Sequence, residues 1–280
     1  MNYIDIEEFF VNGYYEHHLS LKNHKLCPFI VRYSKNPVSS PANWHKNIEI
    51  LLFTEGAGRI QYGKEALPLS PSDIVIIGSG VLHRVYNKSD ACYHVIIIDE
   101  DFCNENGINI STLRFDKIVR DKEAEKLIFS IAAQMNEYRE SEEPLMAAQL
   151  RVSVLSLLII LCQRYSVRDD GASIDSSRAE QYVKSVIEYI NANYSREVNL
   201  DELASLCGIT KFHLAREFRK ITGQTILTYT NILRCKKASV LIAEGKTVTE
   251  AALDCGFDSL SYFSRTYKKI MGNPPSKKDN

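Results

Sequence analysis

Two arginines, Arg216 and Arg265, occupy the same place in two copies of one sequence pattern. The copies are residues 200–223 and 248–272, and in each a cysteine–glycine pair separates two stretches long enough to be helices. A short helix, a tight turn containing glycine and a second helix make a helix-turn-helix unit. An arginine on the second helix can hold the O6 and N7 atoms of guanine together. The matched arginines therefore indicate two DNA-binding motifs in one chain, each with an arginine that can contact base edges.

Further basic side chains on the same predicted helices suit phosphate contacts, which position a protein on DNA without reading its sequence. They are Lys211, Arg219, Lys220, Lys268 and Lys269. An α-helix fits the major groove of DNA. Two such helices, held by one rigid connecting helix over residues 224–244, would enter successive major grooves about 34 Å apart. One chain would then do what a dimer does in simpler repressors.

Capping residues and glycines predict where these helices begin and end. Asn199, Thr210 and Thr247 are N-cap candidates, and Gly208 and Gly256 supply the turns. The predicted helices span residues 179–193, 200–207, 211–221, 224–244, 248–255 and 259–271. The first of them is amphipathic, with a predicted inner side of Tyr182, Val186, Tyr189 and Ile190.

The closing segment carries a more specific signature. It contains the pair Gly256–Phe257, the run SYFSR from Ser261 to Arg265, two lysines and a terminal G-x-x-P-S. Together with the doubled pattern, it resembles the AraC/XylS family of bacterial transcription regulators. The tail 277–280 departs from the tyrosine–arginine ending usual in that family. The resemblance implies base contacts from the outward face of each recognition helix, at Phe212, Ala215, Arg216, Leu260, Ser261, Ser264 and Arg265. Phe212 could equally belong to the core.

The first 110 residues alternate short apolar runs with turn signals, a spacing typical of a β-sandwich or small barrel. Two fragments resemble the motifs of the cupin barrel. The first has His45, Glu49 and a glycine seven residues further on, and the second has Gly78, His83 and Asn87. We expect His45 and Glu49 on one strand, with their side chains on the same face.

In a cupin, two histidines, a glutamate and a later histidine hold a metal inside the barrel. Asn43 stands here at the first histidine position. The remaining set, His45, Glu49 and His83, could still bind iron, manganese or zinc, as in a metal-dependent enzyme of dioxygenase or isomerase type.

The AraC/XylS resemblance favours another interpretation, because those regulators usually use the barrel as a pocket for a small effector, without a metal. We therefore expect no catalytic residue, metal or cofactor. The predicted effector is a sugar or another small polar metabolite, bound by His45, Glu49, His83 and His94. The resemblance to sugar-responsive members points to His94. Each histidine could instead be a hydrogen-bonded residue of the wall.

Residues 115–165 turn helical, with an amphipathic stretch at 121–140 and a second helix that begins at Pro144. The second helix is apolar around most of its circumference, so it is buried on more than one side. One face would cover the barrel. In the family, a helix in this place pairs with its copy in a second subunit, so we expect a homodimer through residues 145–164. The alternative is one helix fully buried within its own domain.

Length and composition complete the prediction. A chain of 280 residues suggests two domains, and its net charge of −1 combines an acidic N-terminal part with a basic C-terminal part. No signal peptide is evident, and the apolar run 152–162 is too short to cross a membrane. Seven scattered cysteines are typical of reduced thiols in the cytoplasm.

We expect a multidomain α+β protein. Residues 1–165 would form a cupin-like β-barrel with trailing helices, 166–177 a linker, and 178–280 an all-α domain with two helix-turn-helix motifs. The predicted function is that of a cytoplasmic, effector-controlled transcription regulator, an activator by family habit. Its partners would be double-stranded DNA and RNA polymerase, and it would not be an enzyme.

Overall fold

The computed structural model describes residues 27–35, 42–63, 65–88, 90–141, 143–168 and 178–275. These residues fall into two compact units, 27–168 and 178–275. The expected linker lies outside the described residues except for Ser166–Arg168, which forms strand β10 and pairs with β8 (Leu113–Phe115). The tail 277–280 also lies outside them.

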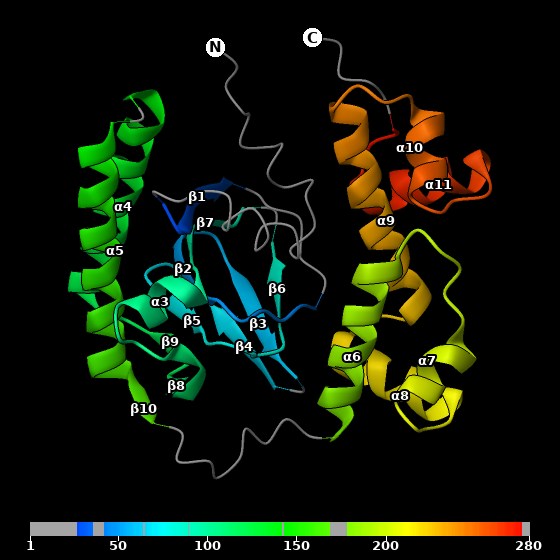
Figure 1. The fold of residues 1–280 in the computed structure, drawn as a ribbon, viewed down its shortest axis with the longest axis horizontal. Helices are drawn as coiled ribbons and strands as arrows, with labels where there is room; N and C mark the ends of the chain where they lie inside the picture. Colours follow the sequence, from blue (N-terminus) through cyan, green and yellow to red (C-terminus); the bar gives the residue numbers. More distant parts are fainter. Residues whose placement is uncertain are drawn as a thin grey trace. The chain divides into compact units, whose positions relative to one another are not determined.

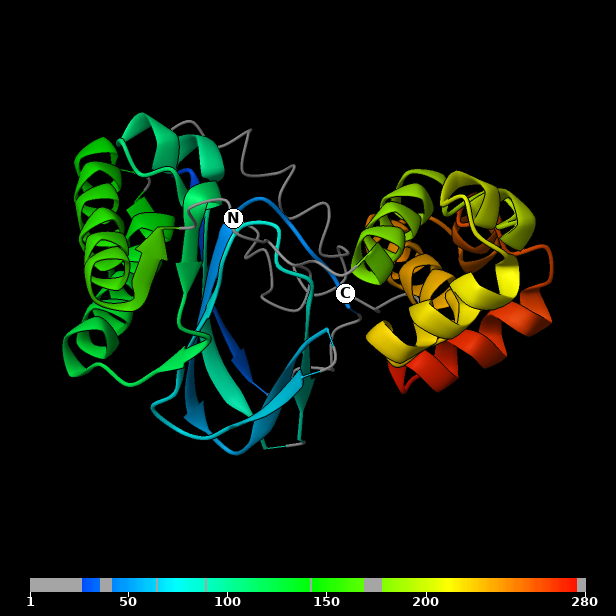
Figure 2. The ribbon, with the colours of Figure 1, turned by 90° about the horizontal axis from the view of Figure 1, so that it is seen from below.

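The strands of the N-terminal unit form two principal sheets, shown in blue and cyan in Figures 1 and 2. In the larger sheet the order is β1 (Phe29–Lys35), β7 (Cys92–Ile98), β2 (Ile48–Glu55), β5 (Ile74–Ile77) and β9 (Ile118–Val119). In the smaller sheet the order is β4 (Glu65–Leu69), β3 (Gly58–Tyr62) and β6 (His83–Asn87). Adjacent strands run antiparallel in both.

These sheets do not close into the barrel that the sequence predicted. Among the described residues, the edge strands of the larger sheet are β1 and β9, and neither belongs to the smaller sheet. Strand β9 has only two residues and pairs with β5 alone among the described strands. The two sheets instead pack face to face, as in a β-sandwich.

The larger sheet is buried on both faces, which explains why β2 and β5 are nearly continuous apolar runs. Leu51, Phe53 and Val95 are among the side chains that pack between the two sheets. Ile48, Ile50 and other side chains of alternate parity pack on the opposite face, against helices. Those helices are α3 (Glu100–Glu105), α4 (Lys122–Ser141) and α5 (Pro144–Tyr165). Figures 1 and 2 show α4 and α5, in green, side by side along the sheet.

Helix α5 is longer than the apolar run 152–162 suggested. Its 22 residues have a mean hydropathy of 2.1 over the most apolar window, so length and composition alone would allow it to cross a membrane. The run 152–162 is one part of this longer helix, because the helix begins at Pro144. Its inner residues, including Leu150, Val154 and Leu158, are buried in the core. A core helix passes the same test of length and composition.

The described residues of the C-terminal unit, 178–275, form helices and connecting turns, in yellow-green to red in Figure 1. Its helices are α6 (Arg178–Asn193), α7 (Leu200–Leu206), α8 (Lys211–Thr222), α9 (Ile226–Ala243), α10 (Val248–Asp254) and α11 (Leu260–Met271). The predicted N-caps are confirmed. The side chains of Asn199, Thr210 and Thr247 each accept a hydrogen bond from the backbone of the following helix, and Thr247 forms a capping box with Glu250.

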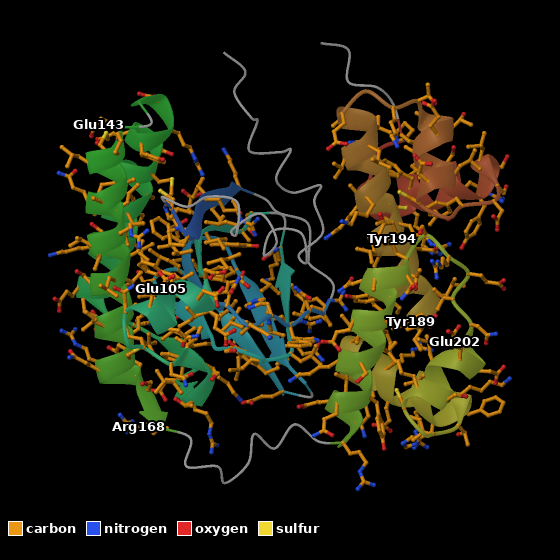
Figure 3. All side chains as sticks on the ribbon, in the orientation of Figure 1. Glu105, Glu143, Arg168, Tyr189, Tyr194 and Glu202 are labelled. Atoms are coloured by element: carbon orange, nitrogen blue, oxygen red, sulfur yellow. The ribbon has the colours of Figure 1, made fainter. Side chains whose placement is uncertain are left out.

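The inner side of α6 differs from the prediction. Its fully buried residues are Val183, Val186, Ile187 and Ile190. Tyr189 is instead only partly buried, and its hydroxyl donates to Glu202 Oε1 of α7 at 2.7 Å; Figure 3 labels both residues. The phenol thus ties α6 to the first motif, because a tyrosine can bury its ring edge and still place its hydroxyl at the surface.

The two turn glycines occupy matching positions but differ in their surroundings. Both have positive φ, +66° at Gly208 and +81° at Gly256. A Cβ at Gly256 would lie 2.4 Å from the carbonyl oxygen of Ser195, whereas a Cβ at Gly208 would meet nothing within 4 Å. Only the second turn therefore needs glycine for space as well as for conformation.

We predict that Gly256→Ala destabilises the C-terminal unit more than Gly208→Ala. Each substitution forces alanine into a left-handed conformation, at a cost of about 1–2 kcal/mol. Gly256→Ala must also displace the backbone at Ser195, which should add at least about 1 kcal/mol. Chemical denaturation of the two variants, followed by circular dichroism, measures the difference. Equal losses of stability would contradict the close approach at Ser195.

Candidate functional site

The outward face of α8 carries the side chains predicted to read DNA in the first motif. Phe212, Ala215 and Arg216 are all exposed. Phe212 is 79% exposed, so it does not belong to the core. Leu214, Phe218 and Ile221 of the same helix are buried and hold it on the unit. One face of α8 is therefore free for a partner.

Helix α11 presents an equivalent face in the second motif. Leu260, Ser261, Ser264 and Arg265 are exposed. Phe263 and Tyr267 face inward, where Phe263 packs edge-on against Phe257. The matching positions of the two repeats thus have the same burial, as the sequence alignment of the repeat predicted.

Neither arginine is locked in a buried ion pair. Arg216 lies with Nε 3.3 Å from Glu217 Oε1 and a terminal nitrogen 2.8 Å from His213 Nδ1, and its side chain is 69% exposed. Arg265 donates from Nε to the carbonyl oxygen of Ser261, in its own helix, at 3.2 Å. Both guanidinium groups can therefore exchange these exposed contacts for hydrogen bonds to DNA.

The predicted phosphate-contacting residues lie around these faces. Arg219, Lys220, Lys268 and Lys269 are exposed in the last turns of α8 and α11. Lys211 differs, because its ammonium lies 3.0 Å from the Asp201 carboxylate. It also lines an open groove of about 470 Å³ with Leu200, Phe212 and Ala215. A phosphate at Lys211 would have to compete with Asp201.

Helix α9 connects the two motifs. Figure 1 shows α7 and α8 at one end of α9 and α10 and α11 at the other. Figure 2, seen roughly along α9, shows the yellow α8 and the red α11 along the same edge of this unit. Asn231 of α9 donates to the Tyr262 hydroxyl of α11 at 2.8 Å, and Arg234 of α9 donates to the carbonyl oxygens of Tyr194 and Arg196. These bonds fix α9 to its neighbours.

In the N-terminal unit, three of the four predicted effector-binding residues come together between the sheets. His45 Nε2 lies 3.0 Å from Glu49 Oε2, and His83 Nε2 lies 3.4 Å from the same oxygen. All three residues are buried, with Glu49 fully so. Burial alone would raise the pKa of the Glu49 carboxyl, but hydrogen bonds and charge from His45 and His83 hold it well below its usual range.

His45 reaches this cluster in a different way from the one predicted. It precedes β2, which begins at Ile48, so it does not share a strand with Glu49. Its Nδ1 bonds to the carbonyl oxygen of Asn47, which turns the ring back toward Glu49. The two side chains meet because of this local bend and not because of strand parity.

His94 lies on the opposite face of the larger sheet. Its ring packs against Tyr33, at 4.9 Å between centroids, and against Phe129 of α4, at 5.1 Å. Burial lowers the pKa of His94. The structure therefore does not bring His94 together with His45, Glu49 and His83, because successive residues of β7 point to alternate faces.

Comparison with known proteins agrees with this architecture. An AraC-like ligand binding domain model matches residues 24–153, and a helix-turn-helix domain model matches residues 203–279. The transposon Tn10 TetD protein of Escherichia coli is 38% identical over 95 residues, which cover 34% of this chain and 69% of TetD. The chain belongs to the AraC/XylS family.

Longer matches span both units of this AraC-family regulator. The transcriptional activator RhaS of Mannheimia succiniciproducens is 26% identical over 262 residues, 90% of this chain and 94% of RhaS. YdeC of Bacillus subtilis, described as an uncharacterized transcriptional regulator, is 21% identical over 84% of both chains. The crystal structure of ToxT from Vibrio cholerae O395 superposes with a TM-score of 0.48, at 14% identity over 89% of this chain and 95% of ToxT.

This AraC-family chain is accordingly a DNA-binding transcription regulator controlled by a small molecule, with an N-terminal ligand-binding domain and a C-terminal helix-turn-helix domain. Its relatives are bacterial transcription regulators.

Sequence reasoning missed several groups that support the two sites. Tyr262 was not predicted to anchor α11, although a tyrosine in an otherwise exposed helical turn could have suggested it. In the N-terminal unit, residues 27–168, which we call the sensor unit, Asn43 and Tyr62 both pair in register with His83. Burial, followed by the nearby charge of Glu49, raises the pKa of Tyr62. The AraC-family regulator thus has a polar cluster larger than the three residues its motifs showed.

Proposed function

We propose that this regulator binds its operator by inserting α8 and α11 into successive major grooves. The observation that carries the proposal is the exposure of Arg216 and Arg265 at matching positions of two motifs braced by α9. These arginines, with Phe212, Ala215, Leu260, Ser261 and Ser264, face the bases. Lys211, Arg219, Lys220, Lys268 and Lys269 contact phosphates, and Ala215 and Leu260 can at most touch a thymine methyl group.

Arg265→Ala and Lys268→Ala separate base reading from phosphate binding on one helix. We predict that Arg265→Ala weakens binding to a cognate site by about 1–3 kcal/mol and relaxes preference at one base pair. Lys268→Ala should weaken cognate and random DNA alike and reduce the slope of log K against log salt by about one.

The cognate site is obtained by selection from random DNA with the full-length protein, and affinities are measured by fluorescence anisotropy over a range of salt concentrations. If Arg265→Ala weakened cognate and random DNA equally, its base-reading role would be excluded.

The sensor part, residues 1–165, is proposed to bind a small polar effector such as a sugar, and to pass its occupancy through the linker 166–177 to the DNA-binding part, 178–280. Occupancy shifts the preferred arrangement of the two parts, which changes the DNA half-sites that are spanned or the contact with RNA polymerase. The naming of RhaS as an activator supports activation. We place the protein in the cytoplasm, where its DNA is.

Catalysis is not part of this proposal. A metal-dependent enzyme needs ligand positions that a substrate can reach. The side chains of His45, Glu49 and His83 are 3% exposed or less, which supports a regulator without enzymatic activity.

Helix α5 is the proposed homodimer contact. Leu145, Val152 and Ile159 are spaced by seven residues and form one exposed stripe; Leu145 is 71% and Val152 66% exposed. If the stripes of two copies of the chain packed against each other, these apolar side chains would be removed from water in both subunits. Such a contact is that of a twofold-symmetric interface.

We predict that Val152→Asp dissociates the dimer, raising its dissociation constant at least about 10-fold, because a carboxylate would be buried without a partner. Val167→Asp is the matched control, since Val167 is 67% exposed on β10, outside the stripe. Sedimentation velocity of the full-length variants measures the dissociation. A wild-type protein that stays monomeric at about 50 µM would rule out this interface.

A further inference from the structure

The contact between the two sheets of the N-terminal unit contains a buried polar cluster around Glu49, in which three atoms of the described residues have no hydrogen-bond partner. Glu49 comes from β2 of the larger sheet and His83 from β6 of the smaller one, while His45 enters from the segment before β2. One ligand atom from each residue lies within 4.8 Å of the others. The imidazole rings of the two histidines are 5.0 Å apart and nearly perpendicular.

Hydrogen bonds from the Nδ1 atoms of His45 and His83 fix the orientation of both imidazole rings, so that each Nε2 faces Glu49. His45 Nδ1 lies 2.9 Å from the carbonyl oxygen of Asn47, and His83 Nδ1 lies 2.9 Å from that of Val81. A carbonyl oxygen only accepts, so each Nδ1 must carry the hydrogen and donate it. Each Nε2 then faces the Glu49 carboxylate, 3.0 Å from Oε2 for His45 and 3.4 Å for His83.

Two imidazole nitrogens and a carboxylate that converge in this way form a set of ligand atoms suited to a cation. A bound metal cation satisfies all three at once. A ring nitrogen that donates to a backbone carbonyl while the other nitrogen faces inward is the arrangement that orients histidine ligands in metal sites.

Further polar atoms point to a bound species. Glu49 Oε1 is buried and has no hydrogen-bond partner, and the same holds for Tyr62 Oη and Asn43 Nδ2. Asn43 and Tyr62 each pair directly with His83 in the strand register, so their side chains share its face of the smaller sheet. Leaving several polar atoms unpaired in a buried site is costly. The second carboxylate oxygen and the phenol can complete a metal's coordination.

We infer that His45, Glu49 and His83 bind one divalent first-row transition-metal ion, which joins the two sheets. Two imidazoles and a carboxylate suit zinc, manganese, iron or nickel, and not magnesium or calcium, which prefer oxygen ligands alone. The burial of all three ligands gives the ion a structural role at the sheet contact. This inference goes beyond the proposed function and does not depend on it, because binding of an operator can be measured with and without the ion.

The test uses the full-length protein, freed of metal with a chelator and then titrated calorimetrically with zinc, manganese or magnesium chloride. We predict one equivalent of zinc or manganese per chain, no binding of magnesium at the same concentrations, and a rise in the melting temperature of the sensor unit. Glu49→Gln keeps the shape of the side chain and removes its charge, and should weaken this binding at least about 100-fold.

His94→Gln is the matched control, because His94 lies in the same sheet but on its other face, against Phe129. This variant should bind the ion like wild type. Ions held by other histidines or by cysteines would persist in Glu49→Gln. If Glu49→Gln is not folded by circular dichroism, His45→Gln replaces it. The site is refuted if wild type binds no equivalent of zinc or manganese, or if both Glu49→Gln and His45→Gln bind it as tightly as wild type.

Discussion

The rigid connection made by α9 is the constraint on which recognition depends. Its 18 residues span about 27 Å at 1.5 Å per residue, close to the roughly 34 Å that separate successive major grooves on one side of DNA. Near its start, Tyr229 packs edge-on against Phe218 of the first motif. Further along, Cys235 and Ala238 enter the core of the second motif. Because both motifs are built onto one buried helix, the two faces proposed to read DNA are held in place before binding, and little orientational freedom would be lost.

The two motifs share one architecture, but the faces proposed to read DNA differ. In the first, Arg216 contacts His213 and Glu217, and an exposed Phe212 lies beside an open groove. In the second, Arg265 touches only its own helix, and the turn at Gly256 is closed tightly against Ser195. A tighter turn and a less encumbered arginine favour precise base contacts from α11. In α8, Phe212 has no hydrogen-bonding group and Arg216 must first leave His213 and Glu217, which favours less specific base contacts. We therefore expect the second motif to contribute more of the preference for DNA sequence.

The helices of the C-terminal unit could be predicted because their start and stop signals lie close together in the sequence. Caps such as Asn199 and Thr247 act within one turn of helix, so the sequence located the helices of the C-terminal unit to within one or two residues. Strand pairing is not local. One edge of the larger sheet is the two-residue strand β9, which comes from beyond the predicted β region. The sequence also did not show that His94 lies on the face opposite Glu49, since the side of a sheet that faces a helix is set by packing with distant segments.

The polar cluster around Glu49 has a cost that the sandwich itself does not require. Apolar side chains such as Leu51 and Val95 fill the rest of the space between the sheets, and replacing a buried charged set by apolar residues is often neutral or stabilising. The cluster therefore weakens the sheet contact when nothing is bound to it. Whatever occupies the site contributes its binding free energy to the folded sensor unit. Since Glu49 and His83 belong to different sheets, that free energy acts on the contact between them. The contact is thus the part of the sensor unit whose stability responds most directly to occupancy.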